Sequence, residues 1–300
     1  MIYTSKNAFI SYPIAVKLVY CFLSISIVCS CAADQVWLND QEPDYNFPDT
    51  NINTTNTAQT IALEADTDLL YPDVSGYWIM KHITHRYSLI PALQEEISTK
   101  IEATMLVEIT QEKNQLVLNE FVCDVHMLNQ PGFGQMIVPD AFLNSLPNRI
   151  RNAELVYMKE TQTGEPWLSM QADVYEETRG VSLKQFSDPL PSDSQDQRIT
   201  DADQDQNPGL TVTLIGFPAG DIYLVQKMWD RLFSNQVSET EISGFIEWND
   251  EQSFLGATSE ALLIDVDRWI PQDQSLHYFT MKRVDQKQCP ARMPAPVVDN

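Results

Sequence analysis

Basic residues are scarce in this chain. Its 300 residues include 19 Lys and Arg against 42 Asp and Glu, which gives a formal net charge of −23 at pH 7. Nucleic-acid-binding surfaces and polybasic membrane surfaces are built from Lys and Arg, so this balance argues against both. A large excess of acidic residues instead favours solubility and the binding of cations.

The signature motifs of common enzyme classes are also missing. The chain has no GxSxG, HExxH, CxxC, Walker or GxGxxG sequence, and it has only four histidines. His82 and His85 lie three residues apart in an expected strand, so they point to opposite faces. Asp124 and His126 share a face, which is the minimum for an oriented general base, but a surface pair is the simpler interpretation. We therefore expect a protein that is not an enzyme, with a hydrolase that uses Asp124 and His126 as the minor alternative.

The N-terminal apolar run is short. It covers Leu18–Val28, about 11 residues, and it follows Lys6 and Lys17. A transmembrane helix needs about 20 apolar residues, whereas a run of this length behind lysines is typical of a secretory signal peptide. The sequence therefore predicts that residues 1–30 are a signal peptide and that the rest of the chain is exported.

The residues that follow, Val28-Cys29-Ser30-Cys31-Ala32, resemble the lipobox of bacterial lipoproteins. In that family the cysteine is acylated and becomes the first residue, so the resemblance implies lipidation at Cys31. Ala32 in the next position would favour passage to the outer membrane, where the lipid would be the protein's membrane contact. The alternative is an ordinary signal cleaved near Ala32 or Ala33, which would leave the protein periplasmic or secreted.

The five cysteines leave one simple pairing after export. Cys21 and Cys29 are lost with the signal peptide, and Cys31 would carry the lipid. Cys123 and Cys289 then remain, and an exported chain with two remaining thiols can pair them. We predict a disulfide between Cys123 and Cys289, with two unpaired cysteines as the alternative.

The chain divides by composition into a tether, a folded domain and a tail. Residues 31–73 are rich in Asn, Asp and Thr with no sustained period, which predicts a flexible tether. Over residues 74–284, β-branched and aromatic residues alternate with period two. This pattern predicts one antiparallel all-β domain, either a barrel or a sandwich, of about ten strands with one or two short helices.

The helices are expected at Asp140–Leu146 and Ser259–Asp265, and residues 285–300 form a Pro-rich tail. The expected strands are Gly76–Ser88, Lys100–Thr110, Gln115–Leu128, Ala153–Lys159, Trp167–Tyr175, Gly180–Phe186, Leu210–Ile215, Asp221–Arg231, Glu241–Trp248, Gln252–Ala257 and Leu276–Val284.

An acidic loop at residues 187–208 interrupts the expected domain. It contains the series Asp201-x-Asp203-x-Asp205-x-Asn207, which resembles the DxDxD calcium loops found outside EF-hands. Oxygens at alternating positions before a turn can converge on Ca²⁺, so these four residues are the candidate ligands of a weak calcium site. A further carboxylate would be needed, for which the candidates are Asp193, Asp196 and Asp221. The alternative is a solvated acidic loop.

The segment Asp201–Thr213 also resembles a loop-and-strand segment of uncharacterised bacterial lipoproteins. This resemblance implies no activity.

The first expected strand opens with Gly76-Tyr77-Trp78, which resembles the GxW signature of lipocalins. In that family the Trp closes one end of a barrel beneath an Arg from the last strand, and Arg283 lies in the last expected strand here. The resemblance implies a barrel that can carry an apolar ligand. The alternative is a glycine turn followed by an ordinary core tryptophan.

These observations favour a non-enzymatic lipoprotein of the cell envelope, a binding or structural β-domain on a tether. A carrier of a small apolar ligand is the first alternative, and an empty barrel interior would favour it over a structural domain. A hydrolase is the second alternative, and it requires a cleft that joins Asp124 and His126 to a nucleophile. The ligand, the partner and the process cannot be read from the sequence.

Overall fold

The computed structural model describes residues 70–90, 94–130, 134–159, 166–216, 219–263 and 266–292. The predicted signal peptide, Cys31 and all but the last four residues of the predicted tether lie outside this part of the chain, so those predictions are not tested. All described residues belong to one unit, Thr55–Asn300. No helix among them is both long enough and apolar enough to cross a membrane.

Strands dominate the described chain, and their hydrogen-bonded order is β10-β12-β1-β2-β3-β4-β8-β9-β6-β5. The elements are β1 Gly76–Ile90, β2 Glu95–Glu112, β3 Gln115–Asn129, β4 Gln135–Ile137, α2 Asp140–Ser145, β5 Arg149–Lys159, β6 Pro166–Ala172, β7 Tyr175–Arg179, β8 Leu210–Ile215, β9 Gly220–Val237, β10 Glu241–Ala257, the 3₁₀ helix η1 Glu260–Leu262, β11 Asp267–Trp269, the 3₁₀ helix η2 Gln274–Leu276, and β12 Tyr278–Val284. Two strands lie off the main order, because β11 pairs with β1 and β7 pairs with β9.

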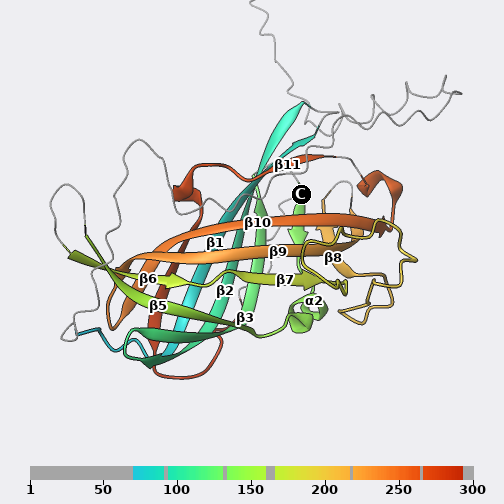
Figure 1. The fold of residues 1–300 in the computed structure, drawn as a ribbon. Helices are drawn as coiled ribbons and strands as arrows, with labels where there is room; N and C mark the ends of the chain where they lie inside the picture. Colours follow the sequence, from blue (N-terminus) through green and yellow to red (C-terminus); the bar gives the residue numbers. More distant parts are fainter. Residues whose placement is uncertain are drawn as a thin grey trace, which may run out of the picture. The chain divides into compact units, whose positions relative to one another are not determined.

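The sheet closes on itself, because β9 also pairs with β10. Two pairs of shorter strands connect β3 with β9 (Figure 1). One pair, β5 and β6, meets β3 at Gln115–Glu120, and the other, β4 and β8, meets β3 at Met127. The long strands β1, β2, β3, β9 and β10 run past both pairs. The predicted antiparallel all-β fold is therefore confirmed, as a closed ring of strands; the described residues also include one short α-helix.

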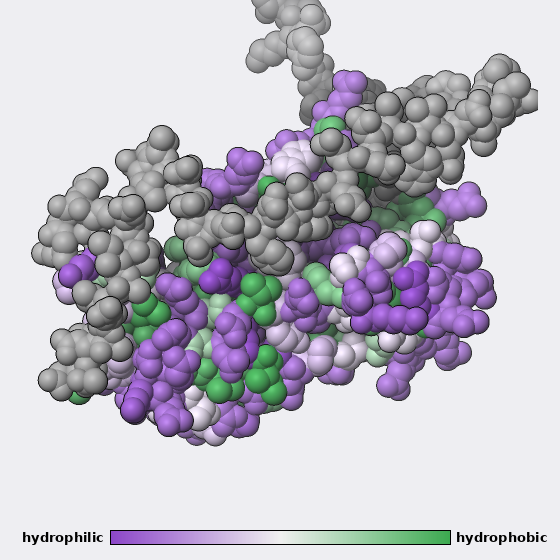
Figure 2. Space-filling view, viewed as in Figure 1, coloured by the Kyte–Doolittle hydropathy of each residue, from purple (hydrophilic) through white to green (hydrophobic). Residues whose placement is uncertain are grey.

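The inward-facing side chains of the strands form three layers along the barrel interior. On β1, Trp78 and Met80 are buried in an apolar core, His82 follows in the middle, and Thr84 and Arg86 face a cavity. The apolar layer is fully packed by residues such as Val107, Leu118, Leu155, Met170, Leu232, Ile246, Phe279 and Met281. Inward-facing side chains thus fill one end of the barrel and leave space at the other. On the outside, Figure 2 shows mainly hydrophilic residues with small hydrophobic patches.

Arg283 closes the packed end of the barrel. Trp78 is fully buried and lies opposite Arg283 in the pairing of β1 with β12. The guanidinium carbon of Arg283 lies 4.9 Å from the centre of the Trp78 ring, and its Nη1 donates to the Ser75 carbonyl at 2.7 Å. The ring nitrogen of Trp78 donates to the Val74 carbonyl at 2.9 Å. The GxW resemblance implies such a contact, and membership of the lipocalin family stays a prediction.

The predicted strand at Gly180–Phe186 is wrong. Only Val181 pairs there, in an isolated bridge with Ile199. The alternation in this segment resembles that of a strand, but the edge of β9 that it could have joined is already occupied by β7 and β8. The expected strand Trp167–Tyr175 is likewise divided, since β6 ends at Ala172 and β7 begins at Tyr175. Three-residue β4 and β11 were missed, because alternation cannot be recognised over so few residues.

Both predicted helices exist, but the second is shorter than expected. The structure has an α-helix at Asp140–Ser145, as predicted. Within the predicted Ser259–Asp265 helix, the residues described, 259–263, form the 3₁₀ turn Glu260–Leu262, in which the Ser259 side chain accepts from the backbone N–H of Ala261. The predicted N-cap is therefore present, but Ser259 caps a single 3₁₀ turn and not an α-helix.

Cys123 and Cys289 are joined by a disulfide, as predicted, with their Cα atoms 5.6 Å apart. Cys123 lies at a bulge of β3, where the register with β2 shifts between Thr104 and Met105. The bond attaches the C-terminal segment after β12 to the outside of the barrel wall. Two side chains strengthen this attachment: Lys287 pairs with Glu108 at 2.6 Å, and Arg292 donates to the Cys123 carbonyl at 3.2 Å.

Candidate ligand-binding cavity

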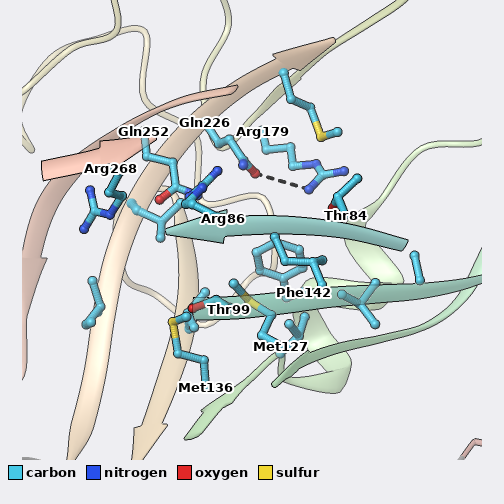
Figure 3. Close-up of a pocket in the computed structure, with 18 of the residues that line it drawn as sticks. Thr84, Arg86, Thr99, Met127, Met136, Phe142, Arg179, Gln226, Gln252 and Arg268 are labelled. Atoms are coloured by element: carbon cyan, nitrogen blue, oxygen red, sulfur yellow. Dashed lines mark hydrogen bonds between the residues drawn. The ribbon is translucent and has the colours of Figure 1, made fainter. Parts of the chain in front are cut away.

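A cavity of about 300 Å³ occupies the open half of the barrel (Figure 3). Its volume lies at the lower end of the range of small-molecule sites. Most of its wall is apolar and comes from β1, β2, β3, β4, α2, β8, β9 and β10. The apolar lining includes Ile97, Ile101, Val125, Met127, Met136, Val138, Phe142, Leu146, Val212, Leu214, Ile222, Leu224, Met228, Trp248 and Phe254.

A group of buried charged residues lies in the middle of the barrel, and one of them, Arg149, lines the cavity. We call Glu120, Arg149, Arg151, Glu177 and Asp230 the charged cluster; none of their side chains is more than 3% exposed. Asp230 contacts both arginines, pairing with Arg149 and, at 2.7 Å, with Nη1 of Arg151. Glu120 lies 2.8 Å from Nε of Arg151.

Ion pairing sets the charge state of this cluster. Burial alone would raise the pKa of the Asp230 carboxyl, but Arg149 and Arg151 outweigh burial and hold that pKa well below its usual range. Burial opposes the charge on Arg149 in the same way, and Asp230, Glu120 and Glu177 more than offset it, so the pKa of Arg149 is raised. Asp230 and Arg149 are therefore ionised at neutral pH, and the guanidiniums of Arg149 and Arg151 also lie over the ring of Tyr175.

His82 lines the cavity at the level of the charged cluster. Burial lowers the pKa of its imidazole to about 4, so the ring is neutral at pH 7. The side chain is 6% exposed, and its Nε2 has no hydrogen-bond partner among the described residues. Buried polar atoms in folded proteins are nearly always paired, so this nitrogen is an exception that calls for a partner.

A chain of polar side chains runs along one wall. Arg86 pairs with Asp250, whose other oxygen accepts from Gln226 at 2.7 Å. The Gln226 oxygen accepts in turn from Nη1 of Arg179 at 3.2 Å, the bond dashed in Figure 3. Arg179 also donates from Nε to Glu177 at 2.5 Å, which connects this chain to the charged cluster.

A smaller polar pocket of about 220 Å³ adjoins the cavity. Three residues, Arg86, Gln252 and Arg268, line both spaces. Asp250 and Trp269 line only the smaller one. The apolar cavity therefore meets a polar opening beside β10 and β11.

The predicted calcium ligands lie outside this cavity, in the loop before β8. Asp201, Asp203 and Asp205 come together with one carboxylate oxygen each, all within 4.8 Å of one another. Asp203 is 7% exposed; its Oδ2 accepts from the backbone N–H of Thr211 at 2.9 Å, whereas its Oδ1 has no partner among the described residues. Burial and the neighbouring carboxylates raise the pKa of Asp203.

The other residues considered for calcium lie elsewhere or have other partners. Asn207 donates its side-chain amide to Asp205 at 3.1 Å. Asp196 pairs with Arg198, and Asp193 accepts from the backbone N–H of Gln195. Asp221 accepts from the Thr213 hydroxyl at 2.7 Å. In the described part of the chain, the acidic group that could hold a metal therefore consists of three carboxylates, and none of the further candidates adds a fourth.

The Asp124 and His126 side chains hydrogen-bond at 2.9 Å, as their shared face predicted. Neither residue lines the cavity. Within the described ranges, no hydroxyl or thiol hydrogen-bonds to the His126 ring. Among the described residues, the pair therefore has no hydroxyl or thiol beside it that could serve as the nucleophile of the hydrolase alternative.

The lining of the cavity and the charged cluster were not predicted. The expected strand begins at Ala153, so Arg149 and Arg151 lie outside it. The chain offers no further guide from known proteins: no family model, no curated protein and no solved structure matches it.

Proposed function

We propose that this protein is an exported binding protein that holds a small ligand with an apolar body inside the barrel. The cavity is the observation that supports this function. Half of the interior is closely packed around Trp78 and Phe279, so the barrel does not need a void for its own stability. The other half keeps about 300 Å³ of space with a mainly apolar wall. Cores are normally packed without voids, and each void destabilises the fold, so a retained cavity suits a ligand site.

The same proposal places the protein in a bacterial cell envelope. The apolar run Leu18–Val28 supports export, and the lipobox-like sequence supports Cys31 as the acylated residue and the outer membrane as the location. We propose a carrier or receptor for a small molecule with no catalytic role. This choice follows the cavity, which favours a carrier over a purely structural domain.

A fluorescent apolar probe tests the proposed cavity. Phenylnaphthylamine, which is neutral and brightens in apolar surroundings, should bind saturably with one site per chain. Val125 lines the cavity, so Val125→Phe should fill part of it and weaken probe binding about tenfold. Val117→Phe is the matched control, because Val117 lies on the same strand but is exposed on the outside. Absence of saturable binding to the natural protein, or equal binding by both variants, would contradict the proposal.

We propose as a second function of the chain that Asp201, Asp203 and Asp205 bind Ca²⁺ weakly. The buried Oδ1 of Asp203, which has no partner, is the specific observation that favours a cation here over a solvated loop. Three close carboxylates repel one another, and a divalent cation relieves this repulsion. The raised pKa of Asp203 has the direction expected from that repulsion together with burial.

Calcium should therefore stabilise the folded protein. At a free concentration ten times the dissociation constant, the gain in unfolding free energy is about 1.4 kcal/mol, and Tm should rise with millimolar Ca²⁺. Mg²⁺ should do much less, because it demands stricter octahedral geometry. Asp203→Asn should abolish the rise, and Asp193→Asn, in the same loop but outside the three, should retain it. No heat of binding and no shift in Tm up to about 10 mM Ca²⁺ would show that the loop is only solvated.

A further inference from the structure

The cavity is lined by charge of one sign, opposite to that of the whole protein. Arg86, Arg149, Arg179 and Arg268 all contribute to its wall. No Asp or Glu is among the described residues that line it. The chain as a whole has 42 acidic against 19 basic residues, so chance alone would favour acidic side chains here.

The acidic partners of these arginines lie on the side away from the cavity. Arg149 and Arg179 line the cavity, while their partners Glu177 and Asp230 do not. Arg86 lines it as well, and its partner Asp250 faces only the smaller polar pocket. Each ion pair is therefore oriented with its cation toward the cavity. A wall of such pairs is close to neutral in total, yet it presents N–H donors and positive potential to whatever occupies the space.

The cavity also has two chemically different sides. In Figure 3, Arg86, Arg179 and Arg268 lie on one side with Gln226 and Gln252. The opposite side carries Met127, Met136 and Phe142. An occupant that fits both sides has an apolar body and a group at one end that accepts several hydrogen bonds.

His82 gives an independent indication of a polar group in the cavity. Its Nε2 is buried, lines the same space and has no partner among the described residues. An oxygen of a ligand could accept a hydrogen bond from this nitrogen. The imidazole interacts with the Asp230 carboxylate as well as with Arg149 and Arg151, so His82 indicates a polar group, and the preference for an anion comes from the arginines that line the wall.

We propose that the natural ligand is an amphipathic anion, with its apolar body against the methionine-rich side and its acidic head group toward the arginines. This inference rests on the proposed function, because it names the chemical class of the ligand held in the same cavity. Arg268 lies at the boundary with the smaller polar pocket, with its guanidinium 4.6 Å from the Phe254 ring centre. A head group directed to that boundary would contact the arginines while the body stays in the apolar part.

Competition against phenylnaphthylamine tests the inference with one tail and several head groups. The competitors are dodecanoate, dodecyl phosphate, dodecanol and dodecyltrimethylammonium, each below its micelle-forming concentration and at 0.15 M salt. We expect at least one of the two anions to displace the probe at about tenfold lower concentration than dodecanol, and the cation to be weakest. The order of dodecanoate and dodecyl phosphate then separates a carboxylate ligand from a phosphate ligand.

Arginine variants show whether the preference comes from the cavity. Arg179→Gln and Arg268→Gln should each reduce the preference for the anion over dodecanol by about five- to tenfold, with little change for dodecanol itself. Arg198→Gln is the control, because Arg198 pairs with Asp196 and does not line the cavity. Arg268→Gln and Arg198→Gln should keep the Tm of the natural protein within a few degrees. Arg179→Gln loses its bond to buried Glu177, so it should melt at a lower temperature, and a single cooperative transition shows that it is folded.

The possible outcomes separate the two proposals. If phenylnaphthylamine does not bind saturably, the proposed function fails and the competition cannot be run. If the neutral probe binds but neither anion competes better than dodecanol, the cavity stands and the anionic ligand is refuted. Equal loss of anion and alcohol binding in the Arg179 and Arg268 variants would also refute it, since the arginines would then act only on the shape of the cavity.

Discussion

Asp230→Asn should lower the free energy of unfolding by about 3–5 kcal/mol, although it changes only one carboxylate to an amide of the same size. Asp230 is fully buried and contacts both arginines of the charged cluster. Without its charge, Arg149 and Arg151 keep only Glu120 and Glu177 as ionic partners. Breaking one member of a buried ionic group leaves uncompensated charge in a region of low dielectric, which costs far more than loss of a surface pair.

Chemical denaturation provides the measurement. The midpoint in urea should fall clearly for Asp230→Asn, whereas Asp173→Asn, an exposed residue after β6, should change the unfolding free energy by less than about 0.5 kcal/mol. An Asp230→Asn protein as stable as the natural one would show that the cluster is not held together by this charge.

The effect should also depend on pH in a defined direction. The pKa of Asp230 is depressed in the folded protein, so its ionised form contributes stability above the unfolded pKa of about 3.9. This contribution is lost as pH falls through the lower, folded value. The difference in stability between the natural protein and Asp230→Asn should therefore be constant near neutral pH and shrink below about pH 4. A difference that grew in acid would contradict the assignment.

The sequence contained a signal for the charged cluster that period-two analysis can recognise. Arg149 and Arg151 share the inward face of β5 with Ala153 and Leu155, as the alternating burial of this strand shows. Glu120 shares a face with Leu116 and Leu118 in the same way. Charged residues on the same face of a strand as apolar residues indicate either that the strand ends there or that the charges are buried together. A strand that begins before Arg149 favours the second interpretation, because both arginines then point inward.

Other features could not be predicted from the chain. The partners of Arg149 come from β3, β7 and β9, so their meeting depends on the order of strands around the ring. The cavity depends on how far apart the lining elements hold their side chains, and local patterns carry no information on that volume. By contrast, the all-β fold and the Cys123–Cys289 bond follow from alternation and from counting cysteines.

Loss of the disulfide should have the second large effect. In the double variant Cys123→Ser, Cys289→Ser, the unfolding free energy should fall by about 4–5 kcal/mol, because the bond closes a loop over a sequence separation of 166 residues and restricts the unfolded chain. Reductant should lower the urea midpoint of the natural protein to the same extent and leave the double variant unchanged. Equal midpoints for the natural protein with and without reductant would contradict this entropic contribution.

The size of this effect depends on whether the tail unfolds with the barrel or before it. Besides the disulfide, the C-terminal segment is held by exposed contacts such as Lys287 with Glu108, and a surface pair of this kind contributes at most about 1 kcal/mol. Without the bond, the segment after β12 should therefore become sensitive to protease while the barrel stays closed, because β12 remains paired with β1 and β10. Limited proteolysis should then remove the tail from the double variant and not from the natural protein under oxidising conditions. If protease cleaved the barrel first, the disulfide would be needed to keep the ring of strands closed. The bond would then stabilise the protein by holding β3 in place and not by holding the tail.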